Sequence, residues 1–260
     1  MIERNFSNRF FSQYLIVSLL LASLSAPGFA QEADPAELSS LYASPTFQQS
    51  VLQKIGKPIL AAGQRSLLGD SAPPSPAAVR VTTTAGLSAN LDYRAQEGIS
   101  RTLREQLVQR VANAEPEQEP EVRSALASGS IWRQFESLLS GIGYSSRNLA
   151  DVMASYYVGA WEIVHRRSAT PGVFRAARDQ IAESLAHSPE IILMTDPEKQ
   201  RTSEALGILT AVAGNGSRAL LLKGDQIGYL AMQTAVYESL LEQGIDLKRL
   251  RLGYQGFEPG

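Results

Sequence analysis

Along residues 92–260, hydrophobic residues recur at every third or fourth position, which is the period of an α-helix. At the start of this region they form one stripe, which consists of Ile99, Leu103, Leu107 and Val111. Pro116 and Pro120 interrupt the pattern. We then expect a short helix and a second helix that ends at Gly141, where a glycine suits the positive φ of a C-cap. The pattern predicts an all-α fold, a compact bundle of about six or seven helices.

The segment RNLADVMASYYVGAWEIVHRR, residues 147–167, combines aromatic residues, carboxylates and a histidine. On a helix its apolar residues cover more than half of the circumference, because Tyr157 and Trp161 widen the apolar stripe. A helix of this kind is buried on most sides, and core packing is the expected role of its aromatic side chains. The remaining narrow face is expected to meet solvent, and it carries Asp151, Ser155, Glu162 and His165.

Two of the following helices carry start signals in the sequence. Thr170 followed by Pro171 is typical of a helix N-terminus, and Thr195 with Glu198 has the spacing of a capping box. The Gly-Asn-Gly sequence at 214–216 disfavours a helix by about 2 kcal/mol relative to alanine. Apolar residues stay in phase on both sides of it, so we expect one long helix with a weak middle.

The last predicted helix begins after Asp225, whose side chain is a suitable cap, and ends before Gly244. The tail at 245–257 returns to a near alternation of apolar and polar residues. This pattern predicts an irregular or short extended segment.

The first 30 residues have the order of a secretory signal peptide. Arg4 and Arg9 precede an apolar run at 14–24, and small residues follow up to Ala30. The run is shorter than the ~20 residues that a membrane-spanning helix needs. We therefore expect residues 1–30 to be removed on export, and no membrane span to remain afterwards.

Residues 31–91 contain many prolines and small residues and show no sustained period. This composition predicts a flexible, mostly irregular linker. The exception is a possible short helix at 45–55, where apolar residues have helical spacing. Residues 92–260 are expected to form the helical domain.

Composition and charge exclude several classes of function. The chain has no cysteine, which excludes disulfides, thiolate catalysis and cysteine-based metal sites. Its formal net charge is −2 and it has no basic stripe, so we expect no nucleic-acid partner. No motif for a cofactor is present in the sequence, and we predict none.

Glu162 and His165 form a Glu-x-x-His pair, of the kind that binds metal ions inside helical bundles. Further carboxylates and a histidine lie on later helices, at Glu183, His187, Glu204 and Glu238. In metal-binding bundles such groups project into the core, whereas Glu162 and Glu183 lie opposite the apolar stripes of their helices. We therefore predict no metal site. Glu162 is instead expected to pair with Arg166, and His165 suits a helix C-terminus.

The sequence contains no motif of nucleophilic catalysis, such as G-x-S-x-G, and only two histidines. The string GNGSRALLLKGD lacks the spacing of a phosphate-binding loop, and no strand precedes it. We therefore predict no catalytic residue. A pair of catalytic carboxylates, as in glycosidases, is defined by geometry rather than by spacing, so it stays open.

The aromatic residues of segment 147–167 have a second interpretation, in which they line a groove for a peptide, glycan or lipid. Core packing is the stronger interpretation, because aromatic residues at helical spacing generally face inward. The binding-surface candidates that this second interpretation selects are Asp151, Tyr156, Tyr157, Trp161 and His165.

Four stretches, NLADVMASYYVGAW, RDQIAESLAHSPE, DPEKQRTSEAL and GIDLKRLRLGYQGF, carry a resemblance over residues 92–257. They resemble a family of exported bacterial helical proteins that is classed as a domain of unknown function. The most specific residues are Asn148, Ala150, Asp151, Tyr156, Ala160, Trp161, Gln180, Gln200, Glu204, Gly244, Asp246, Leu247, Gly256 and Phe257. In similar proteins the long helix is usually uninterrupted, and tryptophan is common where Tyr157 stands. The resemblance implies a compact helical bundle and assigns no activity, substrate or ligand.

Export combined with the lack of catalytic motifs favours a non-catalytic binding or interaction module of the bacterial cell envelope, in the periplasm or outside the cell. Its expected partner is a protein, a glycan or a lipid of the envelope. The alternative is a periplasmic hydrolase or lyase that uses Asp and Glu carboxylates. That alternative predicts a carboxylate with a raised pKa in a concave pocket.

Overall fold

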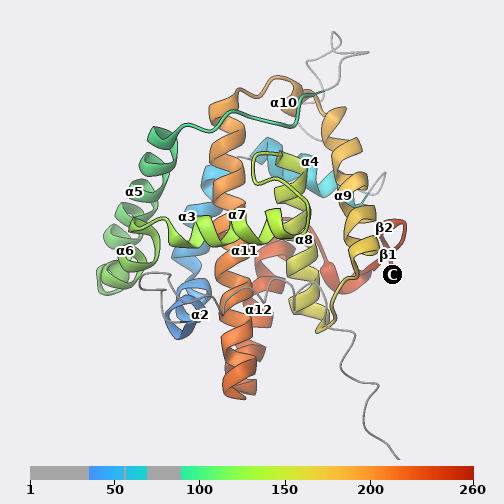
Figure 1. Ribbon diagram of the computed structural model, residues 1–260. Helices are drawn as coiled ribbons and strands as arrows, with labels where there is room; N and C mark the ends of the chain where they lie inside the picture. Colours follow the sequence, from blue (N-terminus) through green and yellow to red (C-terminus); the bar gives the residue numbers. More distant parts are fainter. Residues whose placement is uncertain (1–34, 56, 69–88) are drawn as a thin grey trace, which may run out of the picture.

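A computed structural model describes residues 35–55, 57–68 and 89–260, and most of these residues are helical (Figure 1). The α-helices are α2 (Pro35–Ala43), α3 (Pro45–Ile55), α4 (Lys57–Leu68), α5 (Glu97–Ala114), α6 (Glu119–Ala127), α7 (Ser130–Gly141), α8 (Leu149–His165), α9 (Pro171–Ala186), α10 (Pro189–Ile192), α11 (Asp196–Lys223) and α12 (Gln226–Glu242). The shorter elements are the 3-10 turns η4 (Pro116–Gln118) and η5 (Leu247–Arg249) and the strands β1 (Leu250–Gly253) and β2 (Gly256–Pro259). The all-α prediction is confirmed, and residues 92–260 hold seven helices of nine residues or more besides the one-turn α10.

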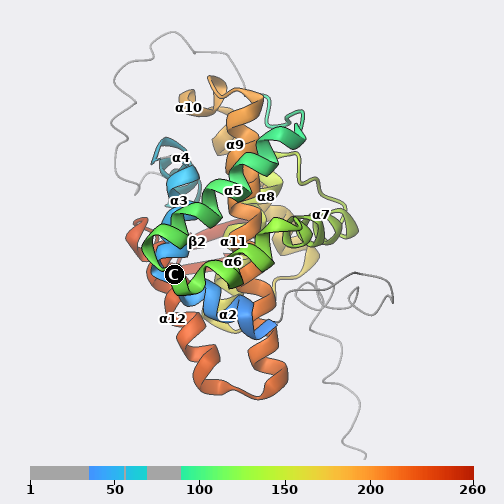
Figure 2. The same cartoon turned by 90° about the vertical axis from the view of Figure 1, so that its left-hand side faces the viewer.

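The long helix α11 is central, and α2, α3, α5, α7, α8 and α12 pack around it (Figures 1 and 2). The Gly-Asn-Gly sequence at 214–216 does not interrupt it, which confirms the prediction of one long helix. The capping box of Thr195 and Glu198 begins the helix, and Gly224 ends it with a φ of 72°. By length and composition α11 could cross a membrane, but 67% of its apolar window is buried inside the protein, as in the core helix of a soluble bundle.

Gly207 allows α7 to cross close to α11. A methyl group at this position would lie 2.5 Å from a ring carbon of Trp132 and 2.8 Å from one of Phe135. The aromatic side chains of α7 therefore pack directly on the α11 backbone, which only a residue without Cβ permits. Helix α7 ends at Gly141 as predicted, but the positive φ, 84°, lies two residues further on, at Gly143.

Helix α8 buries its aromatic face as predicted, but its opposite face does not meet solvent. Asp151 and Glu162 are each 5% exposed, and Ser155 and His165 are half-buried. The prediction of a solvent-facing strip was wrong because α9, α11 and α12 all pack against α8, and Arg178 of α9 and the turn after α8 reach Asp151 and Glu162. Long-range packing therefore decides which polar side chains of α8 are enclosed.

The region predicted to be mostly irregular, residues 31–91, contains three helices in its described part. Helix α3 has the predicted bounds, whereas α2 and α4 were predicted to be irregular. Both are short, and they pack against α11 and α9 respectively, which supplies stability that isolated helices of this length lack. Their buried apolar residues are Leu38, Leu41, Tyr42, Ile59, Ala62 and Leu67. The predicted signal peptide, residues 1–30, lies outside the described residues, as do 69–88.

The C-terminal tail forms a short antiparallel hairpin of β1 and β2 that packs against α9. The hairpin corresponds to the short extended segment that was one of the two predictions for this tail. Gln180 of α9 fixes the hairpin, because its Nε2 donates to the Phe257 carbonyl at 3.0 Å and its Oε1 accepts from the Phe257 N–H at 2.7 Å. The amide of Gln180 thus bonds to β2 as a neighbouring strand would.

The predicted caps of the later helices are confirmed. Thr170 accepts a hydrogen bond from the Val173 N–H at the start of α9, and Asp225 accepts one from the Gly228 N–H at the start of α12. Gly244 follows α12 with a φ of 81°. These signals are local, and so the sequence alone was enough to place them.

Candidate functional site

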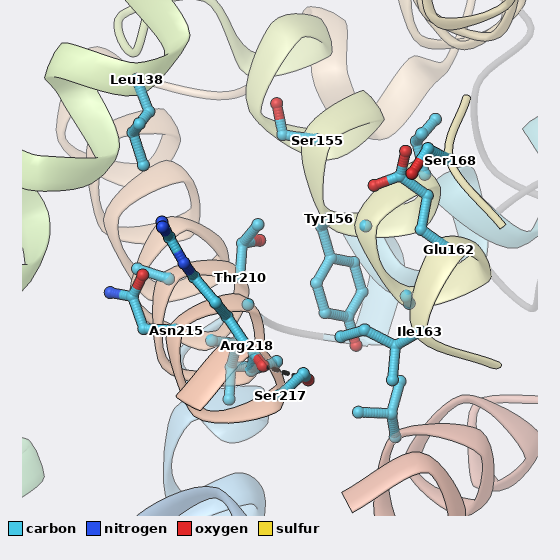
Figure 3. A pocket seen from close by; sticks show the side chains of 18 of the residues that line it. Leu138, Ser155, Tyr156, Glu162, Ile163, Ser168, Thr210, Asn215, Ser217 and Arg218 are labelled. Atoms are coloured by element: carbon cyan, nitrogen blue, oxygen red, sulfur yellow. Dashed lines mark hydrogen bonds between the residues drawn. The ribbon is translucent and has the colours of Figure 1, made fainter. Parts of the chain in front are cut away.

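A cavity of about 480 Å³ lies between α7, α8, α11 and α12, beside the turn that follows α8 (Figure 3). Most of its lining is apolar and comes from leucine, isoleucine, valine and aromatic side chains of these helices. Thr210, Ser217 and Arg218 lie on one face of α11 and bring polar groups to the cavity. A mainly apolar cavity with a few polar groups is the usual form of a small-molecule site.

Glu162 is the buried carboxyl group of this cavity. Its Oε1 accepts a hydrogen bond from the Ala169 N–H at 2.7 Å. Burial raises its pKa to about 8, which the hydrogen bond from Ala169 only partly opposes. Glu162 is therefore mostly protonated and uncharged at neutral pH.

The turn after α8 encloses Glu162. Helix α8 ends at His165, its C-cap residue Arg166 has a φ of 52°, and the chain then folds back so that Ala169 reaches the carboxyl group. The predicted ion pair between Glu162 and Arg166 is not formed. Arg166 instead donates to the Gln226 side chain at 3.1 Å and lies over the Tyr229 ring, with its guanidinium carbon 4.9 Å from the ring centre.

Arg218 lies on the opposite side of the cavity from Glu162, and its side chain extends toward Leu138 (Figure 3). Its Nη1 atom is buried and has no hydrogen-bond partner among the described residues. Burial lowers its pKa, but arginine starts from a value so high that the group stays charged at neutral pH. The cavity thus contains a cation with a free donor, opposite a carboxyl group that is uncharged at neutral pH.

Several hydroxyl groups add weaker polar character to the lining. Ser155, Thr210 and Ser217 each donate to a backbone carbonyl one helical turn earlier, at 2.9, 2.8 and 2.5 Å. Each oxygen can still accept a hydrogen bond. Asn215 donates to the Gln134 side chain at 3.2 Å. None of these groups carries charge, so the electrostatic character of the pocket comes from its arginines.

Of the binding-surface candidates from the sequence, Tyr156 alone lines this cavity. Its hydroxyl accepts a hydrogen bond from Gln243 at 3.1 Å, and burial raises its pKa to about 12. Tyr157 is 1% exposed and packs in the core, where burial also raises its pKa. The two tyrosine rings contact each other with centroids 5.1 Å apart.

The other three candidates connect parts of the fold. The Trp161 indole donates to the Leu250 carbonyl at 3.0 Å, and the His165 ring, stacked on Trp161, donates to the Leu247 carbonyl at 2.9 Å. Asp151 accepts from the Arg178 guanidinium at 2.6 Å and from the Ser145 N–H at 2.8 Å. These contacts hold the C-terminal tail and α9 against α8.

The residues missed at the sequence level are Glu162, which was assigned to solvent, and Arg218. For Arg218 the sequence contained one signal, because this arginine directly precedes the apolar run ALLL in a helix whose apolar stripe is expected to be buried. Within the described part of the chain, no group of three or more His, Asp or Glu side chains could hold a metal ion. The pocket lining contains a single carboxyl group, that of Glu162.

Comparison with known proteins identifies the family and nothing beyond it. No curated protein and no solved structure matches the chain. Residues 11–259 match a family of unknown function, DUF6683. The match covers almost the whole chain and agrees with the resemblance seen in the helical region. The chain therefore belongs to DUF6683, a family of unknown function.

Proposed function

We propose that this protein is an exported, non-catalytic binding module of the cell envelope, and that its cavity binds a small molecule with an apolar body and one anionic group. The free donor of Arg218 in an otherwise apolar cavity is the observation that carries the proposal. A volume of about 480 Å³ is within the range of pockets for small ligands.

The charge of the cavity favours an anion. A buried guanidinium donor without a partner is unfavourable, and a carboxylate or similar group would satisfy it with a charge-assisted hydrogen bond. Glu162 does not supply that charge, because burial keeps it protonated at neutral pH. Arg166 and Arg167 also line the cavity, so its net charge at neutral pH is positive.

Export rests on the N-terminal sequence. The order of basic, apolar and small residues in positions 1–30 is that of a signal peptide. If export occurs with cleavage after Ala30, the intact mass of the protein recovered from the cell envelope will lack these residues. Protein found in the cytoplasm with its full mass would contradict this part of the proposal.

Replacement of Arg218 by glutamine should weaken binding of a medium-chain fatty acid, used as the probe, by about 10-fold to 100-fold, because a charged hydrogen bond contributes about 1.5–3 kcal/mol. The matching fatty alcohol should bind the wild type and R218Q alike. Titration calorimetry measures both affinities. Arg201→Gln is the matched control, since Arg201 is an exposed arginine of the same helix.

Equal loss of affinity in the Arg201 and Arg218 variants would contradict the proposal, as would equal affinity of the wild type for the acid and the alcohol. Wild-type protein that binds neither probe would exclude an amphipathic anion of this size as the ligand. Thermal unfolding of both variants shows whether each remains folded.

A second candidate function is a hydrolase or lyase, and Glu162 favours it. A carboxyl group with a pKa of about 8 in a concave pocket is suited to donate a proton in general acid catalysis. If this function is correct, the wild type will turn over an envelope-derived substrate. Glu162→Gln will abolish the turnover but not the binding of that substrate. Turnover unchanged in E162Q would exclude Glu162 as the acid.

A further inference from the structure

The end of α11 and the start of α12, on either side of the turn that joins them, carry four exposed aliphatic side chains. Leu221, Leu222, Ile227 and Leu230, here called the apolar tip, are 45%, 75%, 83% and 52% exposed. Figure 2 shows that this end of the α11–α12 pair extends beyond the other elements. Such a group of aliphatic side chains at a projecting end is unusual for a surface that meets only water.

Cations surround the apolar tip. Lys223 lies between its two halves, and Arg166 reaches the start of α12, where it donates to Gln226 at 3.1 Å. Arg167 is exposed in the same turn as Arg166. The nearby acidic residue in the connection is Asp225, which caps α12. The local charge is therefore positive.

We infer that the apolar tip inserts into the headgroup region of a membrane that contains anionic lipids. Aliphatic side chains flanked by lysine and arginine are the combination that binds such interfaces, through apolar burial and attraction to the lipid charge. The docking itself does not depend on the proposed ligand binding.

The size of the tip favours a lipid surface over a second copy of the chain. A stable protein interface takes about 20–30 residues from each partner. The apolar tip offers four aliphatic side chains on a convex end, which suits a soft surface that can close around them. Leu221 and Leu222 also line the cavity, so docking would bring the cavity next to the bilayer.

The absence of cysteine allows a direct test at the tip. In the full chain, Leu222→Cys is labelled with an environment-sensitive dye and mixed with vesicles of phosphatidylcholine, with or without about 30% phosphatidylglycerol, a share chosen to give an anionic surface potential. The matched control is Leu193→Cys, because Leu193 is an aliphatic residue 68% exposed after α10.

The dye at 222 should shift to shorter wavelength with the anionic vesicles, and the dye at 193 should not. Addition of Lys223→Gln should weaken the interaction with anionic vesicles about fivefold, since one cation near such a surface contributes about that factor. A shift at both positions, or at neither, would overturn the inference. A shift at 222 that depends on protein concentration and not on vesicles would identify a second copy as the partner instead.

Discussion

Glu162→Gln is expected to raise the free energy of unfolding at pH 7 by about 3 kcal/mol, because it removes a buried carboxyl group that must stay protonated. The ordinary pKa of 4.5 applies to the unfolded chain, and the folded value is about 8. Each pH unit between 4.5 and the working pH therefore costs the folded state about 1.4 kcal/mol. Glutamine can keep the hydrogen bond from the Ala169 N–H, since its Oε1 is also an acceptor.

The effect of Glu162 depends on pH in a defined direction. Between pH 4.5 and 8 the folded state holds a proton that the unfolded state releases, so wild-type stability falls as pH rises through this window. Below pH 4.5 both states are protonated, and the wild type and E162Q should differ little. Urea unfolding at pH 4 and pH 7 measures both limits.

The control for this experiment is Glu183→Gln, which replaces an exposed carboxylate on α9 and should change stability little. A stabilisation of E162Q that is the same at pH 4 and pH 7 would contradict the proposed cause. Such a result would point to better packing of glutamine rather than to the proton.

Gln200→Ala is expected to destabilise the fold by about 3 kcal/mol, because it leaves a cavity at a fully buried site and removes the hydrogen bonds that link α11 to the start of α5. The Gln200 side chain is fully buried between α5 and α11. Its Oε1 accepts from the Gln96 N–H at 2.8 Å, and its Nε2 donates to the Gln96 carbonyl at 2.9 Å and to Glu204 at 2.8 Å. Gln96 is the N-cap residue of α5, but its own side chain does not cap the helix by a hydrogen bond.

Urea unfolding at pH 7 measures the loss in Q200A. Gln255→Ala is the matched control, because Gln255 is exposed in the turn of the hairpin. Equal stability of Q200A and the wild type would show that water replaces the amide at this site. Comparable losses in both variants would contradict a specific role of the α5–α11 contact.

The parts of the fold that the sequence predicted correctly depend on local signals. Thr170, Thr195 and Asp225 act within one turn of their own helix, and α3 has its own apolar stripe. Helices α2 and α4 lack signals of that strength, and contacts with distant segments hold them. Contacts between distant segments cannot be predicted from the local sequence signals of a single helix.

The candidate site was harder to predict than the fold. A helical wheel shows the side of α8 on which Glu162 lies but not what covers it, and the turn from Arg166 to Ala169 encloses that side. For Arg218, the position on α11 was predictable, whereas the unpaired state of its Nη1 atom among the described residues depends on the helices opposite. Both residues acquire their chemistry from burial, which becomes visible only in three dimensions.

Many residues that carry the family resemblance support the fold rather than the cavity. Asn148 caps α8, Asp151 pairs with Arg178, and Trp161 bonds to β1. Gln180 and Gln200 act through their amides on β2 and α5. The resemblance thus describes an architecture, and Glu162 and Arg218 are not among its most specific residues.

The hairpin contacts have a consequence for the order of folding. Trp161 and Gln180 form hydrogen bonds with Leu250 and Phe257, which the ribosome makes much later. In a nascent chain in which α8 and α9 have already emerged, these polar groups still lack the tail, so its packing against α8 and α9 is incomplete. Under the proposed export, this delay would keep the chain loose enough to be threaded through a translocation pore before it closes.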